Sequence, residues 1–176
     1  MWKAFIVGVA ATLAALAAMG LLVMATGAFD VRASTPHHRI IAEITHTTMI
    51  HDVQRSASRA KPPVVTPAEV AAGFAFYEQD CVSCHGAPGV ARAGWASGLV
   101  PSPPYLVDAP RHWSEPQLHW IVANGVKMTA MPSWRSVHSE AQIADLVAFL
   151  EAQPYLSARD YARMRAAWPR VTSASR

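Results

Sequence analysis

Residues 81–86 read CVSCHG, and the two cysteines in this stretch are the only cysteines among the 176 residues of the chain. Two residues separate Cys81 from Cys84, and His85 follows the second cysteine directly. Cysteine spacing of this kind is a specific chemical signal. A structural role, a redox role and a cofactor role each make different demands on the surrounding sequence.

Three common uses of a Cys-x-x-Cys pair fit this chain poorly. A disulfide between Cys81 and Cys84 would close too small a loop to constrain the unfolded chain, and it would leave His85 unexplained. A thioredoxin-like redox pair needs a β-α-β pattern, and a zinc site needs a second pair of ligands; neither is evident. The remaining use is attachment of a c-type haem, in which the cysteines form thioethers and His85 binds the iron.

A helix is expected to lead into this motif. Thr66 is placed to cap it, and Glu69 completes a T-x-x-E capping box. Gly73 and Tyr77 then share one face, eight and four residues before the first cysteine. Because glycine has no side chain, a second helix could cross closely at this position.

That second helix is expected in the segment SEAQIADLVAFLEAQ, residues 139–153. It begins with a capping box and has apolar residues at helical spacing. Leu146 and Phe149 are the expected partners of Gly73 and Tyr77. A third helix is predicted from Ser114 to about residue 124, stopped by a glycine.

The haem motif and the two crossing helices together resemble the class I cytochromes c. In that family the first and last helices cross through a small residue and an aromatic pair. The resemblance implies an all-α cytochrome c fold, with three main helices and long loops around one covalently attached haem c.

The segment NGVKMTAMPSW, residues 124–134, offers the sixth ligand of the iron. A methionine thioether suits low-spin haem iron and raises the reduction potential. Pro132 holds the chain extended directly after Met131, and the segment resembles the axial-methionine loop of small bacterial cytochromes c. We therefore expect His85 and Met131 to bind the iron, and Met128 to fill a gap in the core.

The long loop from Gly86 to Trp113 is expected to cover the haem. A ligating histidine needs an acceptor for its second ring nitrogen, and in the family a proline carbonyl supplies it. The stretch GLVPSPPYL makes Pro101 or Pro103 the candidate, with Leu106 packed on the haem. Candidate donors to the haem propionates are Arg92, Trp95, Trp113 and Trp134.

The N-terminal segment is apolar enough to be a membrane anchor. No charged residue occurs from Ala4 to Phe29, a length that can cross a hydrocarbon core of about 30 Å. A cleaved signal is the alternative, but its apolar part typically has about 7 to 15 residues. The resemblance implies a single-pass anchor in the bacterial cytoplasmic (inner) membrane, with everything after about Asp30 in the periplasm.

Residues 30–65 are interpreted as a juxtamembrane helix and a Pro-rich linker. Ile40, Ile44 and His51 recur at helical spacing with Thr47 or Thr48, so the helix should lie against the membrane or a partner, or form a solvated spacer. The histidines at 37, 38, 46 and 51 lack carboxylate or thiolate partners and indicate polar surface rather than a metal site. On this interpretation, a fragment beginning at Thr66 would keep the spectrum and potential of the whole.

Four segments are therefore expected: a transmembrane anchor (1–29), a juxtamembrane helix with linker (30–65), a haem domain (66–156) and a basic C-terminal tail (157–176). Residues 61–176 carry ten Lys or Arg against nine Asp or Glu, which excludes a nucleic-acid surface. In the tail, Tyr161, Met164 and Trp168 at helical spacing suggest docking on a partner or on anionic lipid.

The resulting hypothesis is a membrane-anchored monohaem cytochrome that transfers single electrons and is not itself an enzyme. Its expected partners are a membrane respiratory complex or periplasmic dehydrogenase subunits, together with the lipid bilayer. The alternative is a catalytic or gas-sensing haem protein, which requires Met131 to be displaceable.

Overall fold

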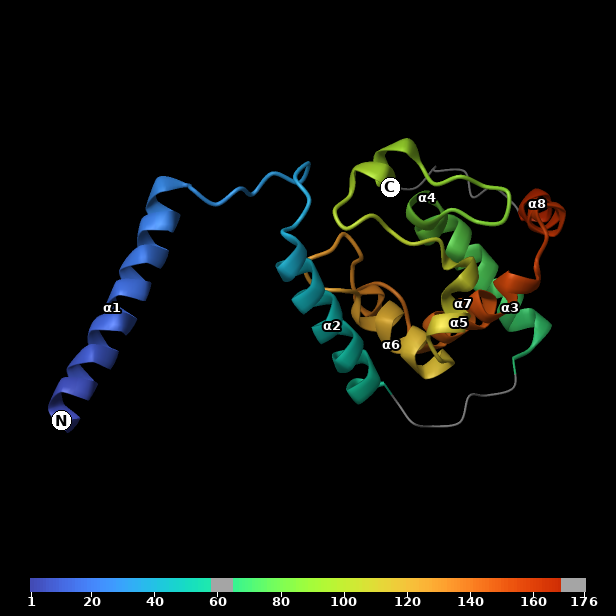
Figure 1. Ribbon diagram of the computed structural model, residues 1–176. Coiled ribbons are helices and arrows are strands. Elements are labelled where there is room, and N and C mark those ends of the chain that lie inside the picture. The colour runs from blue at the N-terminus through green and yellow to red at the C-terminus, as the bar shows by residue number, and fades with distance from the viewer. Residues whose placement is uncertain (58–64, 169–176) are drawn as a thin grey trace. The chain divides into compact units, whose positions relative to one another are not determined.

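The computed structural model describes residues 1–57 and 65–168, and these contain helices, turns and loops but no β-strand. The chain divides into two compact units, Met1–Thr35 and Pro36–Arg176, whose helices are labelled in Figure 1. The expected all-α fold is thus confirmed. The linker prolines at 62 and 63 lie outside the described residues.

The first unit is built on one long apolar helix. Helix α1 (Trp2–Thr26) contains an 18-residue window with a mean hydropathy of 2.4, and it has no buried residues. It ends at Gly27, which adopts a left-handed conformation with φ 64°. Among the described residues it is the one helix whose length and composition would let it cross a bilayer.

In the second unit, helix α3 (Pro67–Phe76) leads into the cysteine motif without a break. The predicted capping box is present, since Thr66 and Glu69 exchange side-chain and backbone hydrogen bonds. A π-helical turn, η1 (Tyr77–Cys81), and helix α4 (Val82–His85) continue the chain. Single π turns inside helices are frequent at functional sites, and this one delivers both cysteines and His85.

Helix α7 (Glu140–Ala152) crosses α3 at Gly73, as predicted. A Cβ atom at Gly73 would overlap the backbone carbonyl of Asp145 and lie 2.8 Å from Cβ of Phe149. Next to this crossing, the ring centroids of Tyr77 and Phe149 are 5.1 Å apart. The predicted small-residue and aromatic contact is therefore confirmed.

Helix α6 (Glu115–Asn124) is the third helix of the core and follows the predicted bounds. Ser114 caps it, Leu118 and Val122 are buried, and Gly125 ends it with φ 68°. The connecting segments contain only short helices, namely η2 (Gly94–Gly98), η3 (Leu106–Asp108), α5 (Ala109–His112), η4 (Trp134–Ser136) and η5 (Gln153–Tyr155).

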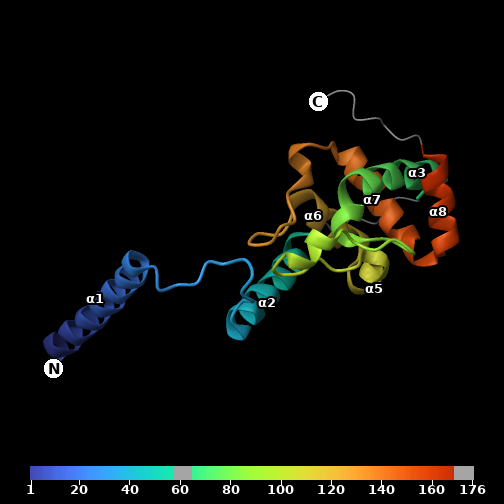
Figure 2. The same ribbon diagram turned by 90° about the horizontal axis from the view of Figure 1, so that it is seen from above.

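Helix α2 (Arg39–Ser56) belongs to the same unit as these helices and lies beside α6 in both views (Figures 1 and 2). Val53 is fully buried, whereas Ile40 and Ile44 are 62 % and 58 % exposed. The C-terminal half of the helix therefore packs against the domain through a face that does not include the isoleucines. This differs from the expected spacer, because the apolar spacing of Ile40 and Ile44 did not identify the packed face.

Helix α8 (Ala158–Ala167) packs against α3 and corrects the expectation for the tail. Tyr161 is fully buried, and its ring makes an edge contact with Phe74 at 5.4 Å. Met164 and Trp168 also pack against the core cluster. The apolar face proposed for a partner or for lipid is thus used inside the domain; the tail arginines at 170 and 176 lie outside the described residues.

A buried carboxylate joins α8 to the π turn before Cys81. Tyr161 donates a hydrogen bond of 2.6 Å from its hydroxyl to Oε1 of Glu78, and Arg165 Nε lies 3.0 Å from Oε2. Burial, together with the hydrogen bond to Glu78, raises the pKa of Tyr161 well above its usual value. The hydroxyl therefore stays protonated and available as a donor.

We expect Tyr161→Phe to lower the free energy of unfolding by about 1 to 3 kcal/mol, because a buried oxygen of Glu78 loses its partner. Denaturant unfolding of the haem-loaded chain in mild detergent, followed by circular dichroism, measures this loss. Tyr155→Phe is the matched control, since Tyr155 is 88 % exposed. Equal, small changes in the two variants would contradict a stabilising role of the Tyr161–Glu78 contact.

Candidate functional site

The second unit encloses a cavity of about 890 Å³ whose surface is mostly apolar. Cys81, Cys84 and His85 line it from the end of the first core helix, and Met131 lines it from the loop after α6. Other predicted site residues on its walls are Pro101, Pro103, Leu106, Trp113 and Trp134. Cys81 and Trp134, which are 53 positions apart in the sequence, thus share one site.

His85 is almost fully buried and held by one hydrogen bond. Its Nδ1 atom lies 2.8 Å from the carbonyl oxygen of Pro104. Because a carbonyl only accepts, Nδ1 carries the proton and Nε2 is left as the free ligand atom. Burial lowers the pKa of His85 despite this hydrogen bond, which favours the neutral ring that binds a metal.

The acceptor of His85 corrects a prediction, since it is Pro104 rather than Pro101 or Pro103. The prolines at 101 and 103 line the cavity instead. Sequence spacing identified the segment but not the residue, because the loop conformation decides which of several carbonyls faces the imidazole.

The two cysteines are free thiols on the cavity wall. Cys81 is buried, and this burial raises the pKa of its thiol far above the usual range. Cys84 is partly exposed. No disulfide joins the two cysteines, so both sulfur atoms remain available for thioether bonds to one cofactor.

Arg92 braces the proline loop rather than lining the cavity. Its Nη1 atom donates to the carbonyl oxygen of Pro103 at 2.5 Å and to Oγ of Ser102 at 2.9 Å. The guanidinium also lies 4.1 Å from the ring centre of Tyr105, a cation–π arrangement. These contacts flank Pro104, so Arg92 supports the acceptor of His85.

Arg92 and Trp95 were predicted as donors to haem propionates, and the structure places both outside the cavity lining. Trp95 is 61 % exposed on the short helix η2, and the Nη1 group of Arg92 is occupied by the proline loop. Trp113 and Trp134 do lie on the cavity wall.

The loop that carries Met131 folds back on the end of α6. The Met131 amide donates to Oγ1 of Thr129 at 3.1 Å, and its carbonyl accepts from the Val126 amide at 3.2 Å. A Cβ atom at Gly125 would lie 2.5 Å from the Pro132 carbonyl, so only glycine allows this close return. Met128 is 67 % exposed, and the expectation that it fills the core is wrong.

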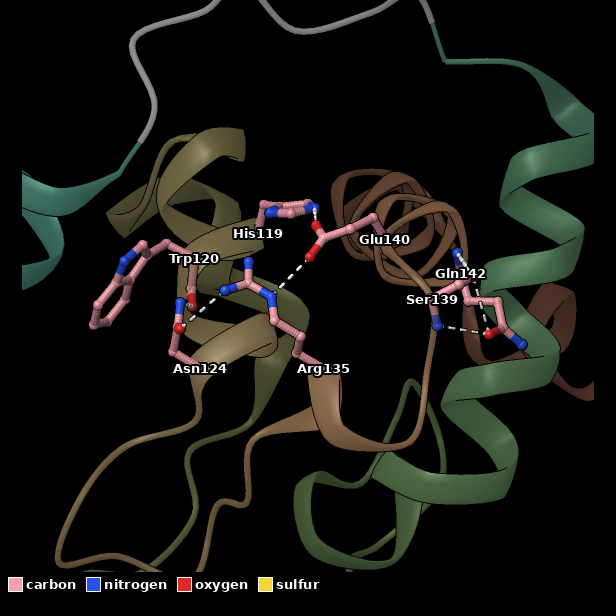
Figure 3. Close-up of polar contacts among 7 residues, drawn as sticks. All are labelled: His119, Trp120, Asn124, Arg135, Ser139, Glu140 and Gln142. Atoms are coloured by element: carbon pink, nitrogen blue, oxygen red, sulfur yellow. Dashed lines mark hydrogen bonds and ion pairs between the residues drawn. The ribbon is translucent and has the colours of Figure 1, made fainter.

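A polar cluster fastens the far end of this loop to two helices (Figure 3). Arg135 Nε donates to Oε1 of Glu140 at 2.7 Å, and His119 Nε2 lies 3.4 Å from Oε2. Arg135 also reaches Oδ1 of Asn124 at 3.4 Å. Helices α6 and α7 and the segment after Met131 are thereby held together at the first turn of α7.

Two further groups at the site were not predicted from the sequence. Tyr77 donates its hydroxyl to the carbonyl of Gly86 at 2.5 Å and so ties the end of the motif to the helix before it. Helix α2 adds His46, Met49, Ile50 and Gln54 to the cavity wall. The available signal was the helical spacing of three apolar residues on the same side of α2, Met49, Ile50 and Val53.

The residues present fit a covalently bound haem. Such a group needs two thiols, a buried imidazole with one fixed nitrogen, and apolar walls that exclude water. All three occur in this one cavity. The fold and the site together define a c-type cytochrome.

Residues 68–150 match the family model described as "Cytochrome C oxidase, cbb3-type, subunit III". This stretch is therefore a class I c-type cytochrome domain, which binds haem c covalently and serves haem-based electron transfer. The match implies the context of a membrane respiratory complex. No curated protein and no solved structure matches the chain.

We expect Arg92→Ala to lower the free energy of unfolding by about 1 to 3 kcal/mol, because the proline loop loses charge-assisted hydrogen bonds. Denaturant unfolding of the haem-loaded chain measures the change. Arg111→Ala is the control. Arg111 forms an exposed ion pair with Asp108, with 3.4 Å between Nη1 and Oδ1, and this pair should contribute less than about 1 kcal/mol. If the free energy of unfolding falls equally little in both variants, Arg92 does not stabilise the proline loop.

Proposed function

We propose that this protein is a membrane-anchored monohaem cytochrome in which His85 and Met131 are the two axial ligands. It accepts one electron from a donor and passes it to an acceptor on the periplasmic side of the cytoplasmic membrane. The observation that carries this proposal is the single cavity that brings together Cys81, Cys84, His85 and Met131.

The bound haem supplies an iron that alternates between two oxidation states. The protein fixes the position of the haem and excludes water from it. His85 is oriented through Pro104 and Met131 through the return of its loop to α6. With two protein side chains assigned to the iron, no coordination position is left for a substrate, which supports electron transfer over catalysis.

The anchored part of the proposal is supported by α1 and by the charge pattern. The helix is long and apolar enough to span a bilayer, and a c-type cytochrome domain is typically periplasmic. The near balance of charges in residues 61–176 argues against a free carrier that finds its partner by electrostatic steering. We propose a lasting association with a respiratory complex or with periplasmic dehydrogenase subunits.

Met131→Ala should convert low-spin haem to a high-spin or water-bound form and lower the reduction potential, because a soft thioether ligand is lost. Absorption spectra of both oxidation states and a redox titration measure these changes. Carbon monoxide should bind the reduced variant but not the reduced parent protein.

Met128→Ala is the matched control, three residues earlier in the same loop and largely exposed. It should leave the spectrum and the potential unchanged. A large effect of Met128→Ala with a small effect of Met131→Ala would overturn the ligand assignment. Rapid carbon monoxide binding by the unmodified protein would instead favour the catalytic or gas-sensing alternative.

Tethering predicts that the full chain remains in the membrane fraction after washing with high salt and co-purifies in mild detergent with other redox subunits. Immunoblotting of washed membranes and identification of the co-purified polypeptides measure this. A chain whose α1 is replaced by a cleavable secretion signal is the control and should appear in the soluble periplasmic fraction. If the full chain is also soluble, α1 is itself removed and the protein is not anchored.

A further inference from the structure

The wall of the cavity extends beyond the part of the chain that matches the cytochrome family. The match begins at residue 68. Helix α2 ends at Ser56, before the matched stretch, and yet its residues contribute to the cavity lining. Met49 and Ile50 are half-buried there, next to the fully buried Val53. A segment outside the family domain thus takes part in enclosing the cofactor site.

The geometry of α2 separates two faces. In a helix of about 3.6 residues per turn, positions three, four, seven and eight apart share a side. The residues that line the cavity or are buried have this spacing, namely His46, Met49, Ile50, Val53 and Gln54. Ile40 and Ile44 fall on the opposite side and are exposed.

We propose that α2 is a wall of the haem pocket that shields the haem from water and raises its reduction potential. Met49 and Ile50 cover the haem on this side, and Val53 fastens the helix to the domain. Loss of an electron leaves the haem with one more positive charge, and a dry, apolar surrounding disfavours the more charged form. Shielding by α2 therefore favours the reduced state.

This role also sets where electrons pass. An apolar helix over one side of the haem keeps small hydrophilic oxidants away from that side, so exchange with partners takes place at the remaining cavity rim. The shielding requires only covalently bound haem in the cavity and is independent of the proposed axial methionine and of the partner complex.

The test is Val53→Asp in the haem-loaded full chain. A carboxylate at this fully buried position should release α2, since burying a charge in an apolar contact is costly. Amide hydrogen exchange should show loss of protection in α2. The reduction potential should fall, and oxidation of the reduced haem by ferricyanide should become faster.

Ile44→Asp is the matched control, the same type of change on the exposed face of the same helix. It should leave α2 protected and both redox readouts unchanged. A second pair of changes, Met49→Ala with Ile50→Ala, keeps Val53 and removes only the cover; it should lower the potential while α2 remains protected. These variants should retain the haem-c absorption of the parent, which separates loss of shielding from loss of the cofactor.

Two results would overturn the proposal. In the first, the α2 amides of Val53→Asp lose protection, but the reduction potential and the rate of oxidation by ferricyanide stay unchanged. This would mean that the helix packs on the domain without shielding the haem. The other is an unchanged potential in the Met49 and Ile50 double variant. A lower reduction potential in Val53→Asp and in the Met49 and Ile50 double variant, with no change in Ile44→Asp, supports α2 as part of the haem site.

Discussion

The close crossing of α3 and α7 at Gly73 is the constraint on which the rest of the haem domain depends. A side chain at this position would collide with the backbone of Asp145, so the two helices meet at a separation that only glycine permits. The contact sets the direction of α3, and the π turn that follows carries Cys81 and His85 to the cavity. Tyr77 holds the motif in place, because its ring contacts Phe149 and its hydroxyl donates to the carbonyl of Gly86. Placement of the attachment motif thus follows from a backbone contact two turns earlier.

The two sides of the cavity are held by different physical means. On the His85 side, a loop without regular structure is positioned by Arg92, which satisfies one of its carbonyls and stacks on Tyr105. On the Met131 side, backbone hydrogen bonds and the close return at Gly125 hold the loop. Both sides therefore limit the movement of the side chains that we propose as ligands, and such pre-organisation would suit a group that gains and loses one electron without changing its partners.

Segments at both ends of the family domain complete it. Helix α8 covers Phe74 and closes over Glu78 through Tyr161 and Arg165, and α2 packs by Val53. A small domain arranged around a cofactor has little apolar surface of its own to bury, so added helices contribute a large share of its packing. The working cytochrome on this view is longer than residues 68–150, the stretch that matches the family model, and we propose that its redox properties depend on the longer unit.

The sequence alone determined the haem class, the three core helices and the site segments, because their signals are local. Cys-x-x-Cys-His needs only five adjacent residues, and capping boxes and the glycine at 73 are visible in single helices. Tertiary structure decided what depends on distant partners: that Pro104 rather than Pro101 or Pro103 faces His85, that Arg92 and Trp95 lie off the cavity wall, and that α2 and α8 pack inward. An amphipathic pattern shows that a face will be covered. Only the folded chain decides what covers it, because a buried face is defined by the surface it meets.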